Sequence, residues 1–102
     1  MEAYENLVEA IEGLRKQGYT EDFNLLQDCI ECRRRDFRLF HHEFHIDKYF
    51  RFDNQTDPGD ESIIYAISSQ DGSHKGILIN GYGIFSEPVT NEMLKKLSIE
   101  NH

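Results

Sequence analysis

The chain has 102 residues and a formal net charge of −8, with 38% hydrophobic and 12% aromatic residues. This size and composition predict one globular domain over residues 1–102 that needs neither a metal nor a disulfide to fold. The negative charge argues against nonspecific nucleic-acid binding and against anionic membrane surfaces, because both need positive charge.

The same sequence predicts a cytoplasmic location. No apolar run approaches the roughly 18 residues that a transmembrane helix needs. The opening residues, MEAYENLVEA, are acidic and amphipathic, whereas a signal peptide is basic and then apolar. In the cytosol the two cysteines would stay reduced.

The first predicted element is a helix over residues 2–17. Its apolar residues recur at spacings of three and four, which is typical of a helix with one buried face. They are Tyr4, Leu7, Val8, Ile11 and Leu14. Gly18 can take the positive φ that ends a helix. We expect a connector over residues 19–27 and a short strand over 28–33.

Residues 43–53 alternate between apolar and polar side chains, which predicts a half-buried antiparallel strand. Lys48 interrupts the alternation, so we expect the strand to bend near it. Residues 54–61 contain Pro58-Gly59, a strong turn signal, and are expected to form a loop.

Two further strands are predicted over residues 62–69 and 76–85. Asp71-Gly72 marks the hairpin loop between them. Asn80-Gly81 inside the second strand predicts a bulge. After it, Thr90 is placed to cap a last helix over residues 91–98.

These elements predict an α+β fold, an antiparallel sheet of three to five strands with an N-terminal and a C-terminal helix packed on one face. The predicted core consists of Leu7, Val8, Ile11, Leu14, Phe50, Phe52, Ile64, Ala66, Leu78, Leu94 and Leu97.

Both faces of the hairpin formed by residues 62–69 and 76–85 are apolar. Ile63, Tyr65 and Ile67 point to one face of the sheet, and Ile64 and Ala66 point to the other. Two short helices can cover one face, so the second needs either the 20–40 segment or another subunit. A homodimer is therefore one hypothesis.

A possible zinc site has the pattern C-x2-C-x8-H-x3-H. It consists of Cys29, Cys32, His41 and His45, and two thiolates with two imidazoles suit tetrahedral zinc. The middle spacing is shorter than in the usual zinc finger. If 28–33 is a strand, the two cysteines face opposite sides, and the alternative is two buried structural thiols. A redox CxxC is a weaker reading, because no βαβ pattern surrounds the pair.

A basic cluster follows the cysteines. It contains Arg33, Arg34, Arg35 and Arg38, with Phe37 and Phe40 nearby. Arginine forks suit phosphate groups, and arginines interleaved with aromatic residues can hold single-stranded nucleic acid. In a chain this acidic, four arginines are more often partners of neighbouring carboxylates.

Several runs resemble a small uncharacterised bacterial family of about this length. They are GYTEDFN (18–24), CIEC (29–32), KYFRFD (48–53), DPGDESIIYAISS (57–69) and KGILINGYG (75–83). Some members carry the label phosphoribosylpyrophosphate synthetase, but the ribose-phosphate loop of that enzyme has no counterpart in this sequence. The resemblance implies a single cytosolic α+β domain and brings no catalytic residue.

The leading functional hypothesis is a non-catalytic binding or regulatory module that self-associates. The first alternative is a protein that binds a metal or a phosphate-bearing ligand through the Cys29–His45 segment. The second is nucleic-acid binding through Arg33–Arg38, against which the net charge argues. The sequence predicts no catalytic residue and no cofactor other than zinc at the site above.

Overall fold

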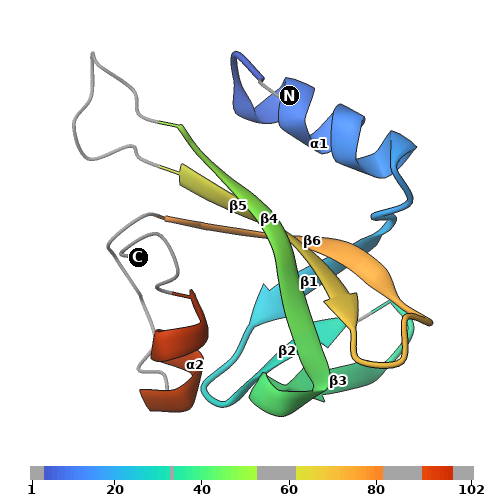
Figure 1. Cartoon of the computed structure of the whole chain (residues 1–102), viewed down its shortest axis with the longest axis vertical. Helices are drawn as coiled ribbons and strands as arrows, with labels where there is room; N and C mark the ends of the chain where they lie inside the picture. Colours follow the sequence, from blue (N-terminus) through green and yellow to red (C-terminus); the bar gives the residue numbers. More distant parts are fainter. Residues whose placement is uncertain (1–3, 33, 53–61, 82–90, 98–102) are drawn as a thin grey trace.

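The structure is a computed structural model that describes residues 4–32, 34–52, 62–81 and 91–97 (Figure 1). The elements in chain order are α1 (Leu7–Lys16), β1 (Glu21–Leu25), β2 (Cys29–Cys32), β3 (Phe37–Phe40), the 3-10 helix η1 (His41–Glu43), β4 (Phe44–Phe52), β5 (Ser62–Ser69), β6 (Lys75–Gly81) and α2 (Asn91–Leu97).

Helix α1 begins later than the predicted residue 2 because Asn6 caps it. The Asn6 side chain accepts a hydrogen bond from the backbone N–H of Glu9 at 2.9 Å, so the first helical residue is Leu7. At the other end Gly18 has a φ of 104°, which turns the chain out of the helix as its position predicted.

The strands form one six-stranded sheet in the order β3-β2-β1-β6-β5-β4. Every neighbouring pair is antiparallel except β1 and β6, which are parallel and place Phe23 opposite Leu78. The prediction of an antiparallel sheet of three to five strands is therefore wrong. The difference lies in β1, within the segment expected to be a connector, and in its pairing with β6 more than 50 residues away, which no local pattern reveals.

The sheet is curled, because its two edge strands are consecutive in the chain. The pairings give β3 and β4 the same direction along the sheet, and only the three residues of η1 join them. The chain thus runs from one edge of the sheet into the other, as Figure 1 shows where β3 leads up into β4. The result is a partly closed barrel with a corner at η1.

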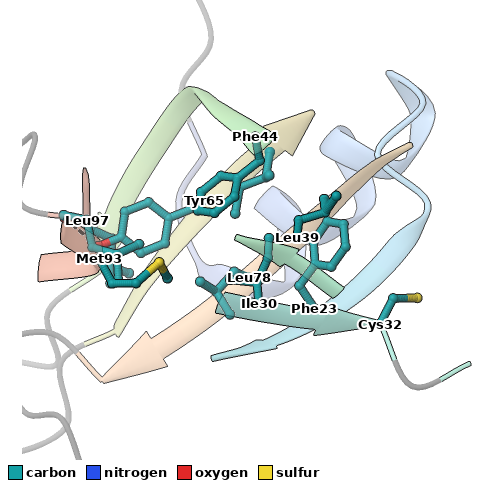
Figure 2. Packing of buried hydrophobic residues seen from close by; sticks show 11 residues of the cluster. Phe23, Ile30, Cys32, Leu39, Phe44, Tyr65, Leu78, Met93 and Leu97 are labelled. Carbon is teal, nitrogen blue, oxygen red and sulfur yellow. Dashed lines mark hydrogen bonds between the residues drawn. The ribbon is translucent and has the colours of Figure 1, made fainter. Parts of the chain in front are cut away.

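The inner face of the curl carries the larger core, which we call the inner cluster. It contains Phe23, Ile30, Cys32, Leu39, Phe44, Ile63, Tyr65, Ile67, Leu78, Met93 and Leu97 (Figure 2). All six strands contribute to it, and α2 adds the last two residues. The Tyr65 hydroxyl donates to the backbone oxygen of Leu97 at 2.8 Å, which ties α2 to β5.

Helix α1 packs on the opposite, outer face. There Ala10, Leu14, Tyr19, Ile64, Ala66 and Ile77 are buried together. The prediction that both helices pack on one face is therefore wrong, because the central residues of β5 and β6 are apolar on both faces of the sheet and each face takes one helix.

The second apolar face of the β5–β6 hairpin is covered by the chain itself. Strands β1, β2 and β3 curl over this face. The 20–40 segment therefore covers the apolar surface for which a second subunit was the alternative. Within the described residues, this arrangement leaves the homodimer hypothesis without its original reason.

The predicted core needs one correction. Val8 is 65% exposed, and Ala10 is the fully buried residue on that part of α1. Leu14, Ile64, Ala66, Leu78 and Leu97 are buried. Four others are partly buried against the residues that α1 covers on the outer face: Leu7, Ile11, Phe50 and Phe52. The side chain of Leu94 lies outside the described part of the structure.

The bend expected near Lys48 is confirmed. The pairing of β4 with β5 shifts register between Ile46 and Lys48, which leaves Asp47 unpaired in the ladder. The freed Asp47 carboxylate accepts hydrogen bonds from the Tyr19 hydroxyl at 2.8 Å and from the Ser68 hydroxyl at 3.1 Å. The bulge thereby ties β4 to β5 and to the entrance of β1.

The expected bulge at Asn80-Gly81 is not observed. Both residues pair with β5 in regular register, and the predicted continuation of the strand beyond residue 81 lies outside the described residues, as do the 54–61 loop and the Thr90 cap. In the ranges that the structure does describe, no helix is long and apolar enough to cross a membrane.

Candidate functional site

A cleft of about 460 Å³ lies between the free edge of β3, η1 and the turn that joins β5 to β6. It is lined by Phe37, Arg38, Leu39, His42, Glu43, Ser69, Gln70, Asp71 and His74, and we call it the Arg38 cleft. The cleft exists because β3 is an edge strand at the corner of the curled sheet. Its volume suits a small molecule or the end of a peptide.

One wall of the cleft is the β5–β6 turn, which Asp71 holds together. Its Oδ1 atom accepts from the hydroxyls of Ser69 and Ser73, each at 2.7 Å, and from the Ser73 backbone N–H at 3.0 Å. The bond from Ser69, and then those from Ser73, hold the pKa of Asp71 well below its usual value. This carboxylate is therefore ionised at neutral pH.

Two bridges join this turn to the other wall. At one end of the cleft the Phe37 ring stacks on the His74 ring, with centroids 4.2 Å apart. At the other end Glu43 accepts twice, from the Phe40 N–H through Oε1 at 2.9 Å and from the Gln70 N–H through its backbone oxygen at 2.7 Å. The edge of β3 is thus open only between these bridges.

The open part of the cleft presents both donors and acceptors, because Arg38, Glu43 and Asp71 all line it. Asp71 and Glu43 each use one carboxylate oxygen to hold the local backbone. Arg38 is exposed and has no ion-pair partner within the described residues, and the imidazoles of His42 and His74 also line the cleft. Among these groups, the Arg38 guanidinium is the one that suits a negatively charged oxygen group of a ligand.

Ser69, Asp71 and His74 are the residue types of a hydrolytic triad, but the hydrogen bonds among them are not those of a triad. In a triad the serine hydroxyl gives its proton to an imidazole that a carboxylate orients. Here the Ser69 hydroxyl donates directly to Asp71 and accepts from the backbone N–H of His74. The three residues form a turn motif, so the geometry supplies no activated nucleophile.

The four residues of the predicted zinc site are not brought together. Cys32 belongs to the inner cluster, and strand alternation places Cys29 on the other face of β2. His41 lies in η1, and His45 is exposed on β4. Among the described residues, no three His, Cys, Asp or Glu side chains are grouped as metal ligands.

The thiol of Cys29 is also poorly suited to metal or redox chemistry. Burial raises its pKa, and Asp28 raises it further. The thiolate is the reactive and metal-binding form, so Cys29 stays protonated and inert at neutral pH.

The predicted arginine cluster separates into different roles. Arg34 is exposed, and Arg35 forms an ion pair with Glu21, with Nε and Oε2 2.7 Å apart. Arg38 alone of the predicted basic residues lines the cleft. Arg33 lies outside the described residues.

Glu21 is a buried polar residue that the sequence did not single out. It lies on the inner face of β1, 8% exposed, and its Oε1 accepts a weak hydrogen bond from the Cys32 thiol at 3.6 Å. With Arg35 on its other oxygen, the carboxylate closes the polar end of the inner cluster, where Figure 2 shows Cys32.

The turn residues from Gln70 to His74 were predicted only as a hairpin loop, and Ser69 was predicted as the end of the preceding strand. Nothing local indicates that they face β3, since that contact depends on the curl of the sheet. Arg38 and His42, in contrast, lie within the segment that the sequence marked as the place for a ligand.

No protein-family model, no curated protein and no solved structure matches this chain. The resemblance to a small bacterial family therefore stays a prediction.

Proposed function

We propose that the protein is a non-catalytic binding module that takes up a small anionic group, a carboxylate or a phosphate, in the Arg38 cleft. This joins the leading hypothesis of a binding module with the alternative of an anionic ligand held by the Cys29–His45 segment.

One observation carries the proposal. Arg38 stands at the open edge of a cleft of about 460 Å³ with no ion-pair partner in the described part of the chain, while the carboxylates that share the cleft are engaged with the backbone. An arginine that is free to form two parallel hydrogen bonds suits a carboxylate or a phosphate.

Two further observations favour binding over catalysis. Ser69 lacks the imidazole partner that would activate it, and Cys29 is held as a protonated thiol. A group that must act as nucleophile needs a neighbouring base or a lowered pKa.

The experiment is a titration of 15N-labelled protein with inorganic phosphate and, separately, with acetate. We expect amide shifts confined to residues 37–43 and 69–74. Arg38→Ala should weaken binding at least fivefold, because a charge-assisted hydrogen bond is lost. Arg34→Ala is the matched control, since Arg34 is exposed on the same segment but does not line the cleft. The affinity of this variant for phosphate and acetate should equal that of the unaltered protein.

Three results would overturn the proposal. The first is equal affinity of both variants and the unaltered protein. The second is stoichiometric zinc in protein purified without chelator, which would make the Cys29–His45 segment a metal site. The third is tight oligonucleotide binding with a steep salt dependence, which would show that the arginines contact a phosphate backbone.

A further inference from the structure

We propose that the Glu43 carboxylate is a built-in competitor of the ligand, which occupies the backbone N–H of Phe40 at the free edge of β3 until a bound carboxylate or phosphate displaces it. This inference rests on the proposed function and adds to it the residue that sets the affinity of the Arg38 cleft.

The first step concerns the direction of the backbone groups of β3. In an antiparallel ladder, successive residues point their N–H and C=O alternately toward the partner strand and away from it. The N–H of Phe40 bonds to the Glu43 side chain, so Phe40 points its backbone groups away from β2. Arg38, two residues earlier, has the same direction. Two backbone donors, the N–H groups of Arg38 and Phe40, therefore face the cleft from this edge.

The hairpin between β1 and β2 gives the same register independently. The N–H of Leu26 donates to the backbone oxygen of Cys29 at 2.9 Å, so Cys29 points toward β1 and away from β3. Cys29 lies opposite Phe40, and Glu31 lies opposite Arg38. Both of these pairs are therefore the type without mutual hydrogen bonds, and β2 uses neither N–H of the edge.

Glu43 shows how a carboxylate is held at this edge. Its Oε1 atom accepts from the Phe40 N–H at 2.9 Å, in a cleft that Arg38 also lines. A charged oxygen on a backbone N–H makes a charge-assisted hydrogen bond, and a ligand carboxylate or phosphate would make a bond of the same kind. The chain's own side chain thus fills a donor that suits the proposed ligand.

The Glu43 side chain can leave this donor while the residue itself stays anchored. Its backbone oxygen accepts from the Gln70 N–H at 2.7 Å, which holds η1 to the end of β5. The side-chain bond to Phe40 is exposed to solvent, where exchanging one acceptor for another changes the free energy little. A ligand anion in place of the Glu43 carboxylate therefore leaves the edge donor satisfied and the corner of the sheet intact.

Asp71, the other carboxylate that lines the cleft, lacks this freedom. Its Oδ1 atom accepts three hydrogen bonds from Ser69 and Ser73, which hold the β5–β6 turn together. Both carboxylates oppose an incoming anion through their charge, but Glu43 is the one that can move away from it. Asp71 is therefore the matched control for the effect of charge alone.

The experiment compares Glu43→Ala, Glu43→Gln and Asp71→Asn with the unaltered protein. Each 15N-labelled protein is titrated with acetate and, separately, with phosphate. We expect Glu43→Ala to bind both anions at least about tenfold more tightly, because it removes a competitor and a like charge. Glu43→Gln keeps a neutral acceptor for the Phe40 N–H, and Asp71→Asn keeps Glu43, so each should gain about threefold from charge alone.

The Phe40 amide reports the displacement itself. In Glu43→Ala without ligand this amide loses its acceptor, so its proton resonance should move upfield and its exchange with solvent should become faster. Acetate should move the resonance back downfield and slow the exchange. If the Glu43 side chain only caps η1, the Phe40 amide of Glu43→Ala will not respond to acetate, and the inference is wrong.

The outcomes separate this inference from the proposed function. If acetate and phosphate bind in an Arg38-dependent way, but no more tightly to Glu43→Ala than to Glu43→Gln, the inference fails and the proposed function stands. If neither anion binds to any of the four proteins, both fail. Should Glu43→Ala not fold, Glu43→Gln decides: a gain in affinity with a Phe40 amide that responds to acetate supports the inference, and no gain overturns it.

Discussion

Glu21 shows how one residue links the core to the polar rim. Its carboxylate lies 8% exposed on the inner face of β1, between the Cys32 thiol and the Arg35 guanidinium. Removing the Glu21 side chain takes away buried packing and the acceptor of the Cys32 thiol, whereas an ion pair whose arginine is largely exposed contributes little.

We predict that Glu21→Ala lowers the free energy of unfolding by about 1–3 kcal/mol, through lost packing and a lost acceptor for Cys32. Arg35→Ala should cost under about 1 kcal/mol, because water screens the exposed guanidinium. Urea unfolding of both variants measures the difference. A larger loss in Arg35→Ala would show that the ion pair, rather than the buried carboxylate, carries the stability.

Asp71 predicts a pH dependence. Hydrogen bonds from Ser69 and Ser73 lower its pKa from the ordinary 3.8. A carboxylate with a lowered folded-state pKa stabilises the fold above its ordinary pKa, and the contribution is lost as the pH falls through the folded-state value. Asp71→Ala should thus be less stable than the unaltered protein at pH 7, with the gap narrowing below pH 3.8.

Chemical unfolding at neutral pH and at about pH 3 measures that gap. Ser73→Ala removes one of the three bonds and should give a smaller effect of the same sign at neutral pH. If the difference in unfolding free energy between Asp71→Ala and the unaltered protein were equal at both pH values, the charge of Asp71 would make no contribution to stability.

The residues of the site differ in how far the sequence could predict them. The odd spacing of Cys29 and Cys32 indicated opposite faces of a strand, and the structure has this arrangement. The ion pair of Arg35 depends on where Glu21 lies, and the place of Arg38 in the cleft depends on where the β5–β6 turn lies. Both are reached only through nonlocal strand pairing.

Among the elements, β1 shows why the fold class was wrong. Its sequence, EDFNL, alternates correctly at Phe23 and Leu25, but a charged residue occupies the first inward position. Glu21 at that position breaks the apolar alternation that would have predicted a strand, so the segment was expected to be a connector.

The parallel pairing of β1 with β6 depends on a close approach at Gly76. A Cβ atom there would lie 2.5 Å from the backbone oxygen of Glu21 and 2.7 Å from the Phe23 ring. Gly76→Ala should therefore separate the two strands and cost about 1–3 kcal/mol of unfolding free energy.

Gly72→Ala is the matched control in the same hairpin. Its φ of 75° strains an alanine by about 1 kcal/mol, but no atom lies within 4 Å of the added Cβ. Both variants are compared by urea unfolding and by exchange of the β1 amides. Faster β1 exchange is expected in Gly76→Ala only, and its absence would contradict the close approach.

Helix α2 is held to the sheet by a bond that a conservative change removes. Tyr65→Phe deletes the hydroxyl that donates to Leu97 and leaves that buried carbonyl without this donor. We expect a loss of about 1 kcal/mol and faster amide exchange in residues 91–97. Unchanged exchange there would mean that Met93 and Leu97 hold the helix by burial alone.

At the scale of the whole molecule, the curl of the sheet produces the site. Consecutive strands β3 and β4 occupy opposite edges, so the corner between them leaves β3 unpaired beside the β5–β6 turn. The sequence predicted strands in the places of β2, β4, β5 and β6, and it marked the 29–45 segment for a ligand. It could not predict the cleft, because closure depends on contacts between strands distant in the chain.

The most direct measurement is hydrogen exchange of two neighbouring amides, Arg38 and Leu39. The account predicts that Leu39, paired with Ile30, exchanges at least about tenfold more slowly than Arg38, whose N–H faces the cleft. Equal exchange of the two amides without ligand, or an Arg38 amide that no ligand protects, would contradict a binding edge at β3.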